Sequence, residues 1–300
     1  MVSLLFLMIN AVAIVHSYKF THFADADIPK KNPRQATFTE KLSLLLFGIN
    51  NPRPTLTHFP AQEYEVIKLQ SNVEIECWRI KRPDAKGTVI LFHGYGGNKS
   101  LMLDKSDEFL KLGYNTFLVD FMGSGGSEGN CTTIGYKEAE QVKTAYYFIK
   151  TSGESNIHLF GTSMGAVAIL KSIKDYKISP SGIIIECPFG SMYETVCARF
   201  NDMNIPQVPM AGMLVFWGGV QNGYWAFGHN PTEYAKYITC PVLLLYGKKD
   251  NRVSMEETEA IFKNLTGKKE LTTYPLAGHE NYLIQYRDEW INSIRAFLEK

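Results

Sequence analysis

The stretch Ile157-His158-Leu159-Phe160-Gly161-Thr162-Ser163-Met164-Gly165 combines three local signals. Residues 157–160 form a short, largely apolar run of the kind found in buried strands, and residues 166–173 continue with apolar residues at helical spacing. Glycines two residues before and two residues after Ser163 allow a sharp turn between these elements. The sequence therefore predicts a strand, a tight turn and a helix, with the serine hydroxyl at the apex of the turn.

The composition indicates a soluble globular body with a full core. Of the 300 residues, 45% are hydrophobic and 13% aromatic, and 31 basic against 30 acidic side chains leave a net charge of +1. This balance excludes a nucleic-acid partner and suits a small neutral or apolar ligand. The five cysteines are scattered and lack C-x-x-C spacing, which excludes a zinc site and a disulfide framework. Cys77, Cys187 and Cys240 are predicted to be small buried hydrophobes.

Strand and helix patterns alternate along most of the chain. Residues 63–69 and 73–81 alternate apolar and polar side chains, which predicts an antiparallel hairpin at a sheet edge. Further strands are expected at 88–92, 116–119, 157–160, 182–185, 242–246 and 270–274, and helices at 39–47, 101–112, 133–150, 164–174, 256–265 and 280–298. The continuously apolar strands predict an α/β fold with a doubly wound, mostly parallel sheet, whose ligands bind beyond the carboxyl ends of the strands.

Three polar residues follow different predicted strands in the order Ser163, Asp250, His279. A serine hydroxyl becomes a good nucleophile when a neutral imidazole can take its proton, and a carboxylate fixes the tautomer of that imidazole. This order is the one found for catalytic triads on such sheets. We therefore predict that Ser163 is the nucleophile, His279 the general base and Asp250 the orienting acid, with no need for a metal or an organic cofactor.

The segment His93-Gly94-Tyr95-Gly96-Gly97 directly follows the predicted strand 88–92. Its glycines allow backbone N–H groups to converge on one point, and a developing oxyanion needs at least two such donors. The N–H groups of Tyr95 and of Met164, the residue after the serine, are predicted to form this oxyanion hole. His93 is expected to brace the loop.

The sequence offers one alternative to His279 as the base and one alternative to Asp250 as the acid. His229 is the other candidate base and Glu186 the other candidate acid, because both lie near predicted strand ends or loops. The glycine-rich loop after Asp120 lacks the spacing of a nucleotide-binding motif, so Asp120 is expected to bond its own turn. His279 is followed by Glu-Asn-Tyr-Leu rather than by the second histidine of H-E-x-x-H, which excludes a zinc protease.

From about residue 55 to the C-terminus the chain resembles α/β-hydrolase-fold serine hydrolases, with five motifs in order: the 93–97 loop, the Asp120 turn, the Ser163 elbow, Asp250 and His279. Within that superfamily it is most similar to esterases and acylglycerol-lipase-like enzymes with a short cap. The resemblance implies one hydrolase domain over 55–300 that cleaves a small-molecule carboxylic ester through an acyl-enzyme on Ser163. The alternatives are a peptidase or thioesterase of the same mechanism, or a non-catalytic, membrane-tethered binding protein on the same fold.

Residues 188–237 lie between two predicted strands and are too long for a single crossover helix, so we predict that they form a cap. The segment is rich in large apolar side chains that suit an acyl chain. Candidates for substrate contact are Met192, Phe216, Trp217 and Trp225. The alternative is that these side chains only pack the cap onto the sheet.

The first 17 residues differ from the rest of the chain. Residues 2–15 are almost wholly apolar, and this run is shorter than the roughly 20 residues of a membrane span. We interpret 1–17 as a signal peptide or membrane anchor, which predicts an exported or membrane-associated protein. The alternative is a buried N-terminal helix on a cytoplasmic enzyme. Residues 18–54 are expected to form an N-terminal extension with one short helix at 39–47.

Overall fold

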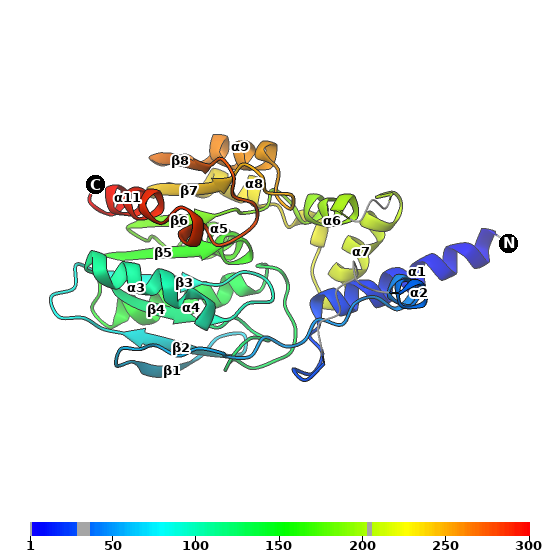
Figure 1. The fold of residues 1–300 in the computed structure, drawn as a ribbon, viewed down its shortest axis with the longest axis horizontal. Coiled ribbons are helices and arrows are strands. Elements are labelled where there is room, and N and C mark those ends of the chain that lie inside the picture. Colours follow the sequence, from blue (N-terminus) through cyan, green and yellow to red (C-terminus); the bar gives the residue numbers. More distant parts are fainter. Residues whose placement is uncertain (1, 29–36, 203–205) are drawn as a thin grey trace.

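The computed structural model describes residues 2–28, 37–202 and 206–300. Within them, an eight-stranded sheet lies at the centre of the molecule with helices on both faces (Figure 1). The strand order is β1-β2-β4-β3-β5-β6-β7-β8. The strands are β1 (Glu65–Gln70), β2 (Glu74–Ile80), β3 (Thr88–Phe92), β4 (Asn115–Val119), β5 (Ile157–Thr162), β6 (Gly182–Glu186), β7 (Val242–Gly247) and β8 (Lys269–Tyr274).

The pairing of the strands agrees with the predicted fold class. β1 and β2 form the expected antiparallel hairpin at one edge, and β2 pairs antiparallel with β4. All pairs from β4 to β8 are parallel. The carboxyl ends of six parallel strands therefore meet at one edge of the sheet, where a ligand is expected in this architecture.

The helices cover two faces with separate apolar cores. Around the sheet they are α3 (Leu103–Leu112), α4 (Glu138–Thr151), α5 (Met164–Tyr176), α9 (Met255–Asn264), α10 (Tyr282–Gln285) and α11 (Arg287–Leu298), with a 3₁₀ turn at Lys99–Met102 before α3. Successive residues of one strand enter different cores: Leu159 packs with α4 and α5, and Phe160 packs with α3 and α11. This alternation explains why the central strands are continuously apolar.

Two predicted helices differ from the structure. The helix expected at 133–150 begins only at Glu138, because the Glu138 carboxylate accepts hydrogen bonds from the N–H groups of Thr133 and Gly135 and holds the preceding loop out of the helix. The helix expected at 280–298 is broken at Tyr286 into α10 and α11. The Tyr286 hydroxyl accepts a hydrogen bond from the N–H of Leu276, so the break ties the helix to the preceding loop.

Two of the three cysteines expected inside are buried and the third is not. Cys77 and Cys187 have almost no exposed surface. Cys240 is partly exposed, because it lies just before β7, outside the covered part of that strand. All five cysteines are free thiols.

Residues 188–237, here called the insert, run between β6 and β7. The insert holds α6 (Met192–Asp202), α7 (Met210–Asn222) and α8 (Pro231–Tyr234), with 3₁₀ turns at Ala226–Gly228 and Ala235–Tyr237. α6 and α7 lie beside the sheet, whereas α8 packs against α5 and α9 (Figure 1). The role of the insert as a cap stays a prediction.

The N-terminal helix α1 (Val2–Thr21) packs against α7 of the insert, and α2 (Phe38–Phe47) lies beside it (Figure 1). Trp217 donates a hydrogen bond from its indole nitrogen to Asn10 at 3.0 Å, and Ser17 bonds Gln221 at 3.0 Å. None of the helices in the described part of the chain has the length and apolar character needed to cross a membrane. Export or membrane association through residues 1–17 stays a prediction.

Gly165 gives a direct test of how α5 approaches the sheet. A Cβ atom at this position would lie 2.4 Å from the carbonyl oxygen of Phe92 and 2.8 Å from that of His93. Because the opposing atoms belong to the backbone, we expect Gly165→Ala to lower the free energy of unfolding by about 2 kcal/mol or more, measured by urea denaturation.

Gly212 provides the matched control, since it lies in α7 and an added Cβ would meet no atom within 4 Å. Gly212→Ala should leave the free energy of unfolding unchanged or raise it by about 0.5–1 kcal/mol. Equal stabilities for the two variants would contradict the close approach of α5 to β3.

Candidate active site

Ser163 occupies a sharp turn between β5 and α5. Its backbone has φ 52° and ψ −111°, a left-handed conformation that costs energy for a residue with a side chain. The N–H of Ser163 donates a 2.8 Å hydrogen bond to the carbonyl oxygen of Glu186 at the end of β6. Gly161 is required here, because a Cβ would lie 2.6 Å from the backbone nitrogen of Ala166. The predicted strand-turn-helix is therefore present and anchored to the neighbouring strand.

Three side chains from different strand ends form a continuous hydrogen-bonded chain. The Nε2 atom of His279 lies 3.1 Å from the Ser163 hydroxyl oxygen, and Nδ1 lies 2.7 Å from a carboxylate oxygen of Asp250. The Asp250 side chain is fully buried, and its other oxygen accepts hydrogen bonds from the N–H groups of Arg252 and Val253. With the proton of neutral imidazole on Nδ1, toward Asp250, Nε2 is free to accept the serine proton.

Cys187, which the sequence predicted only as a small buried hydrophobe, also lies at this site. Its sulfur, a His279 ring nitrogen and an Asp250 oxygen all lie within 4.8 Å of one another. Burial lowers the pKa of His279, whereas Cys187 as a thiolate and the Asp250 carboxylate raise it by more, so the net shift is upward. Within the described ranges these three residues could also converge on a metal ion, but Asp250 and His279 are already bonded to each other.

The loop at 93–97 lies against the serine. A Cβ added at Gly94 would be 3.4 Å from the carbonyl oxygen of Thr162 and 3.7 Å from Cβ of Ser163. Met164 is the first residue of α5, where helix geometry leaves the N–H without an intrahelical acceptor. The backbone of the Tyr95 loop and the N-terminus of α5 therefore both lie next to the serine. The role of Tyr95 and Met164 as oxyanion donors stays a prediction.

His93 and Asp120 brace the loops around the site. The buried His93 ring accepts a hydrogen bond from the N–H of Phe121 and lies 2.8 Å from the carbonyl oxygen of Gly94. Asp120 accepts from the N–H of Gly126 in its own turn, as the sequence predicted. It also forms a buried ion pair with Lys99, which the sequence did not reveal. A lysine that is distant along the chain carries no local signal of such a pairing.

The other candidate base and acid have different partners. His229 is fully buried, with its two ring nitrogens 3.0 Å from the Tyr234 hydroxyl and the Ile134 carbonyl oxygen, and burial lowers its pKa to about 4. The Glu186 carboxylate accepts hydrogen bonds from Thr162 and Trp290. The His279 ring donates its Nδ1–H to Asp250 and to neither of these alternatives.

The four residues predicted to contact substrate do not form one cluster. Met192 is buried in the core, and Trp217 bonds Asn10 of α1 with Phe216 packed against it. Trp225 is 64% exposed. The apolar content of the insert is thus divided among core packing, contact with α1 and exposed surface.

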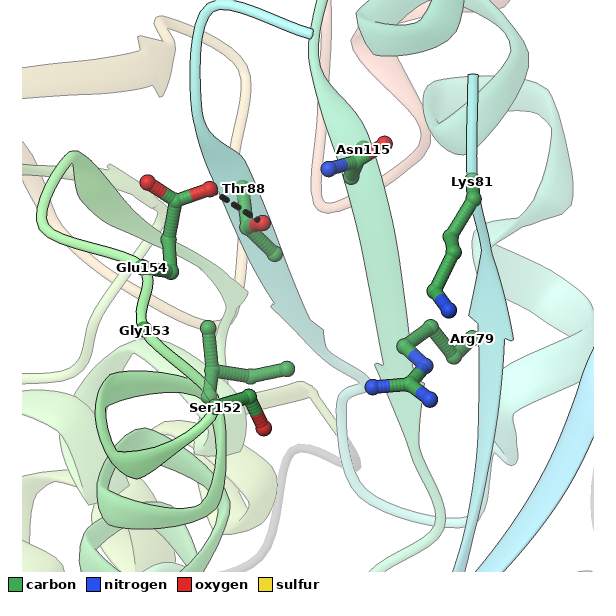
Figure 2. A pocket seen from close by; sticks show the side chains of 8 residues that line it. Arg79, Lys81, Thr88, Asn115, Ser152, Gly153 and Glu154 are labelled. Carbon is green, nitrogen blue, oxygen red and sulfur yellow. Dashed lines mark hydrogen bonds between the residues drawn. The ribbon is translucent and has the colours of Figure 1, made fainter. Parts of the chain in front are cut away.

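A depression on the sheet lies far from Ser163. Figure 2 shows its lining side chains, including Arg79, Lys81, Thr88 and Glu154, and the hydrogen bond from Thr88 to Glu154. Thr88 and Asn115 are the first residues of β3 and β4, whereas Ser163 follows the last residue of β5. The depression is therefore at the amino ends of the parallel strands, opposite the candidate site.

Comparisons with known proteins find a family model, curated relatives and solved structures that are similar to this chain. The family model described as serine aminopeptidase, S33, matches residues 83–217. The uncharacterized protein YqkD of Bacillus subtilis is 26% identical over 238 residues, which cover 78% of each chain. Lysophosphatidylserine lipase ABHD12 of Danio rerio is 26% identical over 64% of this chain and 52% of its own length. The structure of the Pyrococcus furiosus esterase Pf2001 superposes with a TM-score of 0.70, at 23% identity, over 83% of this chain and 97% of the esterase.

Proposed function

Because the chain is an α/β-hydrolase-fold protein similar to esterases and lipases, we propose that it hydrolyses carboxylic esters through an acyl-enzyme on Ser163. The observation that carries the proposal is the continuous hydrogen-bonded chain from Ser163 through His279 to Asp250. A role in ligand binding alone has no physical need for a hydroxyl, an imidazole and a buried carboxylate in this order.

The first half of the reaction forms the acyl-enzyme. His279 takes the hydroxyl proton at Nε2 while the Ser163 oxygen attacks the ester carbonyl. The N–H groups of Tyr95 and Met164 stabilise the oxyanion, and each such donor typically contributes about 3 kcal/mol to the transition state. His279 then gives the proton to the departing alcohol, and the carbonyl re-forms on Ser163.

The second half releases the acid. Water attacks the acyl-enzyme while His279 takes one of its protons, and the proton returns to the Ser163 oxygen as the carbon–oxygen bond breaks. Asp250 stays ionised throughout and stabilises the imidazolium that forms in each half. Burial of the Asp250 side chain strengthens this interaction because little water screens it.

The insert is proposed to act as the cap that borders this site. Asn251, next to Asp250, donates hydrogen bonds of 2.7 and 3.0 Å to the two carboxylate oxygens of Asp202 in α6. The apolar side chains of the insert and the lipase among the relatives favour an ester with an apolar acyl group as the substrate.

The second candidate activity is peptide hydrolysis by the same steps, which the serine aminopeptidase description of the matching family favours. Thioester hydrolysis shares the mechanism as well. The three activities differ in the leaving group that must accept the proton from His279, so a direct comparison of substrates separates them.

We expect the wild-type protein to hydrolyse a 4-nitrophenyl ester with a higher kcat/KM than the matching thioester or aminoacyl 4-nitroanilide. Ser163→Ala should abolish turnover of all three while leaving the circular dichroism spectrum unchanged. Ser172 is a buried serine in α5, the helix that follows Ser163, and its hydroxyl has no partner among the described residues. Ser172→Ala is therefore the control and should keep full activity. Faster cleavage of the anilide than of the ester would identify the protein as a peptidase instead of an esterase. Turnover retained by Ser163→Ala would reject Ser163 as the nucleophile for either activity.

The pH dependence should report His279. Since its pKa is raised and only the neutral ring accepts a proton, kcat/KM should rise with pH through a midpoint above the ordinary value of about 6.5. Cys187→Ala removes one of the groups that raise the pKa, so the midpoint of the profile should move to lower pH. A profile unchanged by Cys187→Ala would contradict an electrostatic effect of Cys187 on the base.

A further inference from the structure

Arg199 is a cation without a polar partner among the described residues. Its Nε atom is shielded from solvent and has no hydrogen-bond acceptor, and no ion pair joins its guanidinium to a described carboxylate. The guanidinium packs against two aromatic rings, 4.7 Å from the centroid of Phe20 and 5.7 Å from that of Tyr95. An unpaired buried donor on a charged group is costly, so this position needs an explanation.

The location of Arg199 connects it to the proposed active site. Tyr95 belongs to the loop whose Gly94 lies against Ser163, and its own N–H is one of the two predicted oxyanion donors. The guanidinium of Arg199 lies 5.7 Å from the ring centroid of this residue. Arg199 therefore packs beside a loop that borders the proposed nucleophile.

The guanidinium of Arg199 is not neutralised by a paired carboxylate in the described part of the chain. Burial is the main cause that lowers the pKa of Arg199. The Asp202 carboxylate is already held by Asn251 through both oxygens. Arg199 thus keeps an unpaired N–H donor and no carboxylate among the described residues pairs with it, so an anion beside its guanidinium would stabilise the charge.

We propose that Arg199 binds an anionic group of the substrate, a carboxylate or a phosphate, and so makes the site selective for anionic esters. This inference rests on the proposed esterase function and names its substrate class. Guanidinium groups recognise both anions through paired N–H donors, and the unused Nε–H of Arg199 belongs to such a pair. The aromatic rings of Phe20 and Tyr95 hold the guanidinium in place by stacking.

Two matched substrate pairs test the proposal and separate the two anions. For a carboxylate, 4-nitrophenyl pentanoate is compared with mono-4-nitrophenyl glutarate, which differs in its terminal group. For a phosphate, a monoacylglycerol is compared with the same acylglycerol carrying a 3-phosphate. We expect wild-type kcat/KM to be at least about tenfold higher for the anionic member of one pair, the value of one charge-assisted hydrogen bond.

Arg199→Gln should remove this preference, mainly through KM, and change kcat/KM for the neutral member by less than about twofold. Arg199→Lys keeps the charge and should restore part of the preference. Arg295→Gln is the matched control, because Arg295 is exposed on α11 near Leu112 and Tyr114, away from the strand ends that carry the site. Arg295→Gln should leave kcat/KM for the neutral and the anionic substrate of each pair unchanged.

The outcomes are distinguishable. No preference for either anion in the wild type, or an equal loss for neutral and anionic esters in folded Arg199→Gln, would overturn the proposal and leave Arg199 a packing residue between α1 and α6. Failure to hydrolyse any ester would reject the proposed function instead. A readout without turnover then remains: glutarate or glycerol 3-phosphate should raise the melting temperature of the wild type and not of Arg199→Gln. An equal rise in both proteins would again overturn the proposal.

Discussion

The left-handed backbone at Ser163 is the constraint on which the rest of the site depends. A side chain in this conformation costs on the order of 1–3 kcal/mol and persists only when its surroundings fix it. Here the N–H of Ser163 is bonded to Glu186 of β6, and Gly161 and Gly165 let the turn and α5 approach backbone atoms that any Cβ would strike. The strain holds the hydroxyl away from the sheet and toward His279, so the fold itself positions the proposed nucleophile.

The sheet supports this turn through buried polar groups rather than apolar packing alone. Glu186 has no exposed surface, and its carboxylate binds Thr162 on β5 and Trp290 on α11. Because an unpaired buried carboxylate would be very costly, these bonds fix β5, β6 and α11 relative to one another at the strand ends. The insert is linked to the same edge by the Asn251–Asp202 hydrogen bonds, so its position and that of the acid loop are coupled.

Features with short-range signals could be predicted from the sequence, and features made by distant contacts could not. Each strand and the turn at Ser163 have a hydrophobic or glycine pattern within ten residues that predicts them. The parallel order of the strands then places Asp250 and His279 at the same edge of the sheet. The pairing of Lys99 with Asp120, the break at Tyr286 and the proximity of Cys187 to His279 depend on partners that only the folded chain brings close. The contacts of the apolar residues in the insert could not be predicted either, because an apolar pattern is compatible with packing against α1, against the core or against a substrate.

The central claim is that Ser163 is an activated nucleophile, and covalent labelling tests it most directly. The folded protein is treated with a fluorophosphonate, digested, and the modified residue identified by peptide mass spectrometry. The proposed mechanism predicts a single phosphonyl group on the Ser163 oxygen, because only that hydroxyl is bonded to an imidazole that is in turn held by a buried carboxylate among the described residues. Absence of labelling in folded protein, or labelling at another residue, would contradict the claim.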